Sequence, residues 1–528
     1  MQALIEAKEA RSKKINKIED LKTIKTPMEM YASLDEVCKS GVENIKDEDA
    51  KFFFKCLGFF FKPDNKFMLR IRITGGQLTY EQAIKLGEVS QKYGEDYIDI
   101  TTRQQLEFRF LPLETLATVL RELQSVGIST FQTGVDNFRG VVTSSFDGLG
   151  EDKIIECKPL VDGIQSIFLE KEDWIGTLPR KFNTAILGNK VNDCNIYGHD
   201  CCFVIAKKGE TLGFNLYLAG KNGVQATDSG LFVKQEEVVA TFHAVIELFK
   251  KYGFRDNRNK NRLFFLLEAV GMDAFVDAIK QTTNLTYESS GEILCKKEYT
   301  LDESGVYDLG EGQKAVHFSI PSGVFTGTAM RQAGELAKSV NGKLRLSVEQ
   351  SFFIICDESK VQEVQTSELY KSYSQYHNIY FNHQIACAGT HTCSFGVIPN
   401  KPDAIDMANY LNQEVPIKDG KVRMYWSACP KACGIHGVAD IGFEGCKAKD
   451  EEGNTVYGVH IFLGGKATKE AKEARVILKS VPLTKAREYV KNLLVVYRDN
   501  KEVGESFESF EDRYLADLET EKIAEMIS

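Results

Sequence analysis

Two long stretches of the chain carry the same order of hydrophobic and polar positions. In residues 67–111, runs of β-branched and aromatic residues flank a glycine turn and a segment with helical spacing. Residues 315–358 repeat this order, so that Gly76 aligns with Gly323 and the segment 100–104 with 346–350. Each copy is therefore predicted to be a βαβ-like piece of an α+β domain.

The repeat continues downstream. The segment 213–220 resembles 458–465, and both are predicted to be strands that end in glycine turns. Three matches in one order, at a nearly constant offset, favour duplication over chance similarity. We expect a pseudo-twofold molecule whose equivalent lobes, 134–220 and 376–466, meet at a cleft that holds a large ligand. Outside the repeats, helices are predicted in 1–50, 467–480 and 483–499.

Length, charge and cysteine usage narrow the class of protein. The 528 residues include 66 basic and 75 acidic side chains, and the net charge of −9 argues against general nucleic-acid binding. No run approaches the ~18 apolar residues of a membrane span, and the first residues lack the apolar core of a signal peptide. The 13 cysteines are scattered and odd in number, which suits a reducing compartment. We expect a cytoplasmic protein that binds neither nucleic acid nor membrane.

Four of the cysteines form two closely spaced pairs. Five residues separate Cys387 from Cys393, three separate Cys429 from Cys433, and 35 lie between the pairs. Thiolates are natural ligands of iron, so the two loops are predicted to hold one iron–sulfur cluster from opposite sides. A structural zinc site is a second interpretation, although zinc pairs usually enclose about two to four residues. Incidental thiols or disulfides are a third.

Basic residues recur at predicted strand ends and in turns. Singly, such a residue is more often part of a surface ion pair. Together, in equivalent halves of a repeat, they would line a cavity that binds a polyanion. These residues are Arg103, Arg139, Arg180, Lys181 and Arg423, with Arg255, Arg258, Lys260 and Arg262 concentrated at 250–262. The basic run at 8–25 is interpreted as a solvated helix face.

The motifs TTRQ, DNFRG, LPRKFN, NRNKNR, CAGTHTC and VRMYWSACPKACG occur in an order that resembles the siroheme-containing nitrite and sulfite reductase family, from about residue 50 to 500. The resemblance implies a [4Fe–4S] cluster on Cys387, Cys393, Cys429 and Cys433, with Cys433 also ligating the siroheme iron. It implies that the siroheme carboxylates are bound by Arg103, Arg139, Arg180, Arg258, Lys260, Arg262 and Arg423. The implied catalytic residues are Arg103, Arg139, Lys181 and Asn183, with Lys181, or a water that it polarises, as the proton donor.

The same resemblance implies an internally duplicated, pseudo-twofold α+β fold: a ferredoxin-like two-part domain with two related lobes that bind siroheme and cluster. The expected divisions are a peripheral helical segment at 1–66, half-domains at 67–133 and 301–375, a siroheme and substrate lobe at 134–300, and a cluster lobe with C-terminal helices at 376–528.

Substrate choice depends on single positions. Asn183 stands where similar sulfite reductases have a second lysine, and one cation fewer suits a monoanion, so we expect six-electron reduction of nitrite to ammonium. Sulfite reduction, or another siroheme or cobalamin-pathway reaction, is the alternative, and a non-catalytic zinc-binding protein ranks below it. Lys431, and Thr390 with His391, depart from the family pattern. His391 and His436 are interpreted as hydrogen-bonding residues rather than ligands.

The electron donor is predicted to be a separate protein. No glycine-rich dinucleotide fingerprint follows a predicted strand, which argues against direct use of NAD(P)H. An acidic carrier such as ferredoxin would dock at Lys13 and Lys14 or at the lysines of 431–449. We expect the enzyme itself to be a monomer.

Overall fold

The duplicated pattern folds into two five-stranded antiparallel sheets. The computed structural model describes the whole chain except residues 222, 297–298, 302–303 and 468–470. The first sheet has the order β1-β2-β5-β4-β13 and the second the order β11-β12-β15-β14-β3. The strands of the first half are β1 Phe59–Phe61, β2 Phe67–Ile71, β3 Gln77–Leu78, β4 Tyr97–Ile100 and β5 Leu106–Leu111. Those of the second half are β11 Val306–Gly310, β12 Gln313–Phe318, β13 Val324–Thr326, β14 Lys343–Leu346 and β15 Phe352–Asp357.

The two halves exchange edge strands. β13 of the second half pairs with β4, and β3 of the first half pairs with β14. Two glutamines make the same exchange: Gln104 Nε2 donates to Leu346 O at 3.0 Å, and Gln350 Nε2 donates to Ile100 O at 2.8 Å. Each half thus supplies a strand and a side chain to the other.

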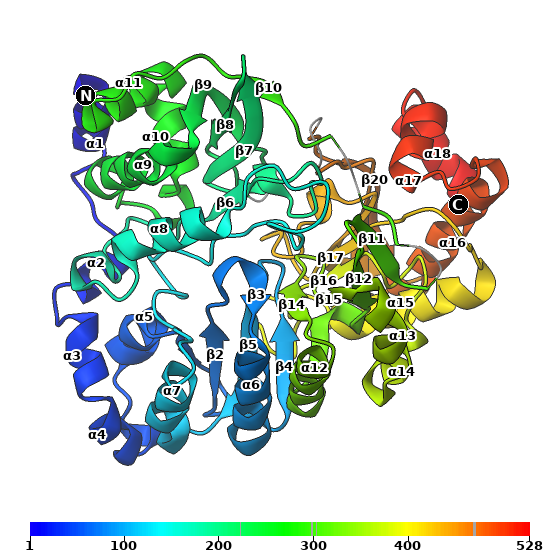
Figure 1. Cartoon of the computed structure of the whole chain (residues 1–528), viewed down its shortest axis with the longest axis horizontal. Helices are drawn as coiled ribbons and strands as arrows, with labels where there is room; N and C mark the ends of the chain where they lie inside the picture. Colours follow the sequence, from blue (N-terminus) through cyan, green and yellow to red (C-terminus); the bar gives the residue numbers. More distant parts are fainter. Residues whose placement is uncertain (222, 297–298, 302–303, 468–470) are drawn as a thin grey trace.

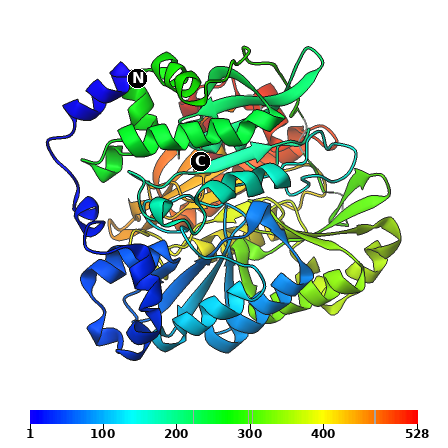
Figure 2. The ribbon, with the colours of Figure 1, turned by 60° about the vertical axis from the view of Figure 1, so that its left-hand side comes forward.

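Helices cover the outer side of these sheets (Figures 1 and 2). They are α6 Tyr80–Tyr93, α7 Leu116–Gln124, α12 Gly327–Ser339, α13 Val361–Gln365 and α14 Glu368–Ser374. α6 and α12 are equivalent and lie side by side, with Gly87 against Gly327. A Cβ on Gly87 would lie 2.5 Å from Gly327 O, so this close approach requires glycine.

The two lobes repeat one sheet topology. In the first, β6 is parallel to β7, and β8 and β9 follow antiparallel; in the second, β17 is parallel to β18, and β19 and β20 follow antiparallel. The first lobe comprises β6 Thr184–Leu187, β7 Cys201–Lys208, β8 Thr211–Leu218, β9 Thr227–Lys234, β10 Glu292–Ile293, α8 Lys158–Phe168, α9 Val238–Tyr252, α10 Leu263–Val270 and α11 Met272–Thr283. The second comprises β16 Gln384–Ala386, β17 Met424–Ser427, β18 Ile441–Lys449, β19 Thr455–Leu463, β20 Arg475–Pro482, α15 Lys401–Glu414, α16 Leu483–Asn500, α17 Phe507–Phe510 and α18 Thr520–Ile527. The predicted duplicated α+β fold is therefore confirmed, including the matched strands β8 and β19.

The predicted helix at 467–480 is wrong over its described C-terminal part. Arg475–Pro482 is the strand β20, which pairs with β19. The helical spacing of 483–499 does correspond to α16. Residues 468–470 of the predicted helix lie outside the described residues.

The N-terminal segment is helical at first, with α1 Gln2–Ala10, α2 Lys17–Leu21, α3 Pro27–Ala32 and α4 Leu34–Lys39. It is not peripheral throughout, because Phe52, Phe53 and Phe54 are fully or almost fully buried around the short helix α5 Phe54–Cys56, and β1 belongs to the first sheet. Aromatic side chains in this stretch pack on Phe67, which explains why it joins the core.

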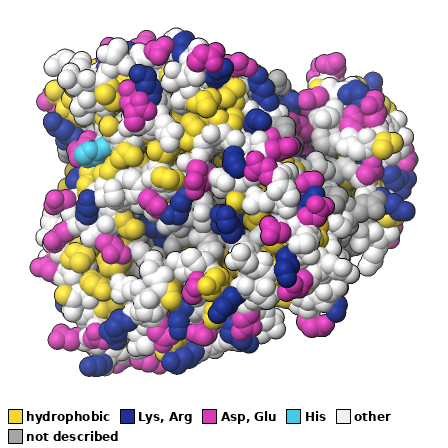
Figure 3. Space-filling model, viewed as in Figure 1, with side chains coloured by type: hydrophobic (Ala, Val, Ile, Leu, Met, Phe, Trp, Pro, Cys, Tyr) yellow, Lys and Arg dark blue, Asp and Glu magenta, His cyan; other side chains and the backbone are white. Residues whose placement is uncertain are grey.

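Acidic and basic side chains alternate over the face seen in Figure 3, where no extended patch of one sign forms. Among the described residues, no helix is long and apolar enough to cross a membrane.

Candidate functional site

A cavity of about 360 Å³ lies where loops from all four sheets meet. Its walls come from the β4–β5 turn, the segment before β6, the loop at 194–199, and the loops at 386–396 and 428–435. The two lobes, which come from the first and second halves of the sequence, therefore both contribute loops to the cavity wall. Of the residues predicted for the site, eight line this cavity: Arg103, Arg139, Lys181, Asn183, Cys387, Cys393, Cys429 and Cys433.

The four thiols form one side of the cavity. Cys433 is exposed, and all four are free. Burial, with smaller contributions from the neighbouring Cys433 and Cys429, raises the pKa of the Cys387 thiol to about 12. Burial also raises the pKa of the Cys429 thiol, and Cys433 and Cys393 add to this effect. Because burial and neighbouring thiols oppose ionisation of Cys387 and Cys429, a cationic ligand such as an iron cluster would favour their thiolate forms.

Two N–H groups already point at one of these sulfurs. Cys387 Sγ accepts from the Ala428 backbone N–H at 3.2 Å and from Asn400 Nδ2 at 3.4 Å. Such donors stabilise a thiolate and orient it toward a cluster. Within the described part of the chain, no three His, Cys, Asp or Glu side chains gather closely enough to hold one metal ion.

Cations also line the cavity. Arg103 follows β4 in a tight turn, and burial, together with the charge of Arg70, lowers its pKa to about 10. Its buried Nε has no hydrogen-bond partner among the described residues. Arg139 donates from its two terminal nitrogens to Gly134 O and Val135 O, each at 3.0 Å. Its pKa is well below the usual value because of burial and of Arg70 and Arg103.

Lys181 is a third cation of the cavity wall. Burial lowers its pKa well below the usual value, and the charges of Arg262 and Arg103 lower it further. Within the described residues its ammonium makes no ion pair or hydrogen bond. Nearby, the buried Oδ1 of Asn183 also lacks a partner. Unsatisfied donors and mutually repelling cations are the features expected of a site completed by a polyanion.

Five predicted cofactor-binding residues do not line the cavity, and four of them are held by internal contacts. Arg258 makes two hydrogen bonds to Asp136, and Arg262 makes two to Asp200, all at 2.7–2.8 Å. Arg423 is paired with Asp440 and Glu508, and Arg180 Nε donates to the Arg258 carbonyl. Lys260 is exposed. Arg258, Arg262 and Arg423 are therefore occupied by carboxylates of the protein.

Sequence reasoning missed several residues of the wall. Lys62, Arg70, Asn195 and His199 all line the cavity. Arg70 could have been found, since it alternates with the buried Leu69 and Ile71 in β2 and so faces the other side of the sheet. His199 precedes Asp200 in an irregular loop, where no sequence period marks its direction.

The departures from the family pattern have distinct surroundings. The Lys431 ammonium lies 4.2 Å from the centre of the exposed Phe395 ring, at the cavity. His391 is exposed. His436 is buried against Phe462, and burial lowers its pKa to about 4. Neither histidine lines the cavity.

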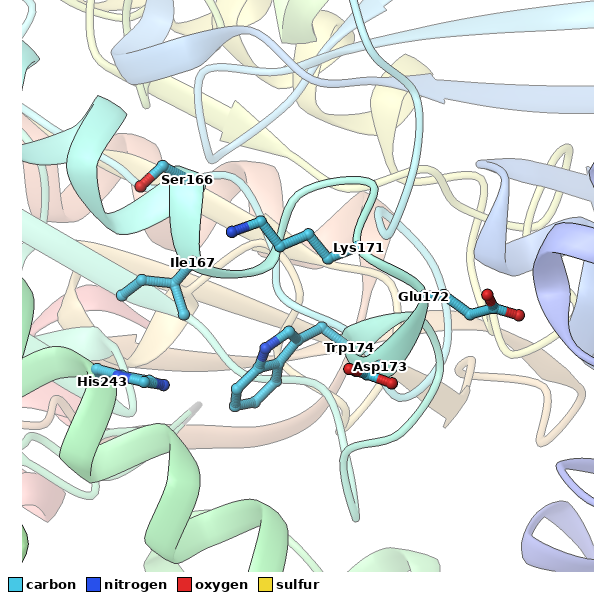
Figure 4. Close-up of a pocket in the computed structure, with 7 residues that line it drawn as sticks. All are labelled: Ser166, Ile167, Lys171, Glu172, Asp173, Trp174 and His243. Carbon is cyan, nitrogen blue, oxygen red and sulfur yellow. The ribbon is translucent and has the colours of Figure 1, made fainter.

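Another hollow, of about 520 Å³, lies between α8, α9 and the short turn at Trp174 (Figure 4). Its wall carries charges of both signs, including Lys171, Glu172 and Asp173, and it contains none of the predicted site residues. Size alone would favour this hollow, whereas the concentration of thiols and unpaired cations favours the other cavity.

Comparison with known proteins agrees with this geometry. The family described as nitrite and sulphite reductase 4Fe-4S domain matches residues 134–286 and 383–510, and the nitrite/sulfite reductase ferredoxin-like half domain matches 61–126. A ferredoxin–nitrite reductase of Leptolyngbya laminosa is 31% identical over 91% of this chain and 96% of its own length. A chloroplastic ferredoxin–nitrite reductase of Spinacia oleracea is 30% identical over 89% of this chain and 83% of its own. The structure of the Mycobacterium tuberculosis NirA protein superimposes with a TM-score of 0.86 at 23% identity, covering 97% of this chain and 98% of the other.

Proposed function

Since the chain belongs to the nitrite and sulphite reductase family, we propose that it reduces nitrite to ammonium with six electrons taken from reduced ferredoxin. One observation carries the proposal: three cations whose pKa values are lowered line the same cavity as four cysteine thiols. The names of the relatives support nitrite and ferredoxin.

The family's cofactors are a siroheme and a [4Fe–4S] cluster, and the residues of the cavity fit both. Cys387, Cys393, Cys429 and Cys433 would hold the cluster, with the exposed Cys433 as the ligand shared with the siroheme iron. Arg103 and Arg139 would face the siroheme carboxylates and the substrate. When bound, the siroheme iron supplies the position for the small anion, and the cluster supplies electrons one at a time.

The side chains have separate tasks. Arg103 and Arg139 hold positive charge where oxygen charge develops, and guanidinium groups keep their protons. Lys181 is the better proton donor, because burial and the charges of Arg262 and Arg103 lower the pKa of its ammonium, whereas guanidinium groups keep their protons. Each oxygen of nitrite that leaves as water takes up protons, so a donor beside the anion shortens the transfer.

Substrate choice is tested through Asn183. Steady-state kcat/KM for nitrite and for sulfite is measured with reduced ferredoxin, and we expect nitrite to be preferred. Asn183→Lys adds a cation to the wall and should shift the ratio toward sulfite, a dianion, whereas the exposed control Asn259→Lys should not. A tenfold preference of the unmodified enzyme for sulfite, about 1.4 kcal/mol in transition-state binding, would instead favour sulfite reduction.

The shared-ligand role of Cys433 has its own test. Cys433→Ser should abolish nitrite turnover, because the link between cluster and siroheme is lost, while the other three cysteines still hold iron. Full turnover by this variant would contradict the role.

The ferredoxin face is a further part of the proposal. Lys13 and Lys14 border a surface hollow of about 490 Å³ with Arg11 and Arg258, while Lys431 lies at the cavity. The ferredoxin KM and its salt dependence are measured for the double variant Lys13→Glu, Lys14→Glu and for Lys431→Glu. An N-terminal docking site requires a higher ferredoxin KM and a weaker salt dependence in the first variant; if both are unaltered, that site is excluded.

A further inference from the structure

His199 is a buried histidine of the cavity wall to which the proposed reaction assigns no task. Its side chain lines the cavity, and the residue is only 5% exposed. The Nδ1 atom is buried and, among the described residues, has no hydrogen-bond partner. Because the residue lines the cavity, a ligand bound there can supply a hydrogen-bond partner for its imidazole.

The backbone holds the ring in place from behind. Gly220 packs so closely that a Cβ there would lie 2.4 Å from the His199 carbonyl oxygen. The same carbonyl accepts from the Cys202 thiol, with 3.4 Å between sulfur and oxygen, and the following residue, Asp200, is fixed by Arg262. The backbone that carries the imidazole is therefore held by close contacts on both sides of the residue.

Charged groups surround the ring from several elements. Arg103 lies in the β4–β5 turn, Arg262 precedes α10, Lys181 precedes β6, and Asp200 is the next residue in the chain. Without an anion, burial and the charge of Arg103 lower the pKa of His199 to about 3, with a smaller effect of Arg262. The carbonyl groups of Ile196 and Asn195 act in the opposite direction and favour a proton on the ring.

An anion in the cavity reverses this balance, because it offsets the charge of the neighbouring guanidinium groups. We propose that His199 takes up a proton when an oxyanion binds in the cavity and then donates a hydrogen bond to that oxyanion. The oxyanion is a siroheme carboxylate or nitrite itself. The inference rests on the proposed function and adds to it a binding residue whose charge changes with occupancy.

Proton uptake is measured by titration calorimetry of the holoenzyme with nitrite between about pH 5 and pH 7, in two buffers of different ionisation enthalpy. We expect uptake by the unmodified enzyme, and an affinity that rises up to tenfold for each unit that the pH falls. Lys181 also gains protons, so the contribution of His199 is the difference between the enzyme and His199→Asn. His243→Asn, an exposed histidine on α9 outside the cavity, is the matched control and should equal the unmodified enzyme.

A second variant separates hydrogen bonding from protonation. His199→Gln can donate a hydrogen bond at every pH, so it should bind nitrite without the pH dependence due to His199. If His199→Asn and His199→Gln keep the full proton uptake on nitrite binding and on loading of the apoprotein with siroheme, the inference is wrong. Uptake lost only during loading assigns the bond to a carboxylate of the cofactor, and uptake lost only with nitrite assigns it to the substrate.

If the variants do not fold, proton uptake by the unmodified enzyme alone still tests the inference. Absence of proton uptake in both titrations overturns the inference. Its failure is distinct from failure of the proposed function: an enzyme that reduces nitrite without this proton uptake refutes only the role of His199, and one that prefers sulfite refutes the nitrite assignment.

Discussion

The buried ion pair behind the cavity gives the sharpest test of how the cationic wall is stabilised. Arg262 Nε and Nη2 donate to the two carboxylate oxygens of Asp200 at 2.8 and 2.7 Å. Asp200 also accepts the backbone N–H of Asn183 at 2.8 Å. Asp200→Asn keeps the shape of the side chain, removes its charge, and leaves the Arg262 guanidinium uncompensated beside Arg103 and Lys181.

The expected loss of stability follows from how deeply the two side chains of the pair are buried. The side chains of Asp200 and Arg262 are 0% and 10% exposed, and breaking a pair of this kind costs about 3–5 kcal/mol. The pair of Arg11 and Asp256 has the same two-point geometry, at 2.8 and 2.6 Å, but its side chains are 26% and 21% exposed. Solvent screening limits such a pair to about 0–1 kcal/mol. Asp256→Asn is therefore a matched control with the same chemical change.

The assay is urea unfolding followed by tryptophan fluorescence. The chain has two tryptophans, the buried Trp174 in the first lobe and Trp426 in the second. In a Trp426→Phe background the signal reports the first lobe, where Asp200 lies. We expect Asp200→Asn to lower the free energy of unfolding by at least 2 kcal/mol more than Asp256→Asn, a difference of the order set by burial. Equal effects of the two substitutions would refute the reasoning.

Three further predictions concern buried carboxyl groups and packing. Burial opposes ionisation of Asp99, but Lys401, 2.7 Å away, and Arg109 outweigh it and lower the pKa from 3.8 to about 2. The lowered pKa contributes about 2.5 kcal/mol to the free energy of unfolding above about pH 4, and this contribution is lost as the pH falls toward 2. Asp99→Asn should therefore flatten the acid side of a plot of melting temperature against pH. Asp193 changes stability with pH in the opposite direction, because burial raises its pKa to about 6 and the free energy of unfolding falls as the pH rises through that value. Asp193→Asn should therefore raise the melting temperature at about pH 8 but not at about pH 4. Gly87→Ala should cost about 1–3 kcal/mol in urea unfolding, because its Cβ would meet the Gly327 carbonyl, whereas Lys85→Ala on the same helix should cost under about 0.5 kcal/mol.

The part of the site that could be predicted from sequence consists of residues whose motif fixes their position. The two cysteine pairs lie in short loops, and Arg103 follows a strand whose repeat could be recognised, so local spacing was sufficient. The same repeat predicted the duplicated sheets, which the fold confirms.

What could not be predicted depends on partners that are distant in sequence. Arg258 and Arg262 look like cofactor ligands in NRNKNR, but Asp136 and Asp200 neutralise them from 122 and 62 residues away. A helix is predicted over 467–480, but its described C-terminal part forms β20, because pairing with the edge of β19 decides its conformation. No sequence signal marks His199, because only the assembled fold places its side chain in the cavity wall.

The exchange of β3 and β13 has a consequence for how the two halves of the chain diverged. Neither half has a complete sheet by itself, so neither can be lost, rearranged or separated without exposing an unpaired strand edge in the other. Such mutual dependence preserves the arrangement of the scaffold while leaving the loops at its strand ends free to change. The cavity-facing loops of one copy could then specialise in thiols and those of the other in cations, because the scaffold keeps both in register however different their chemistry becomes.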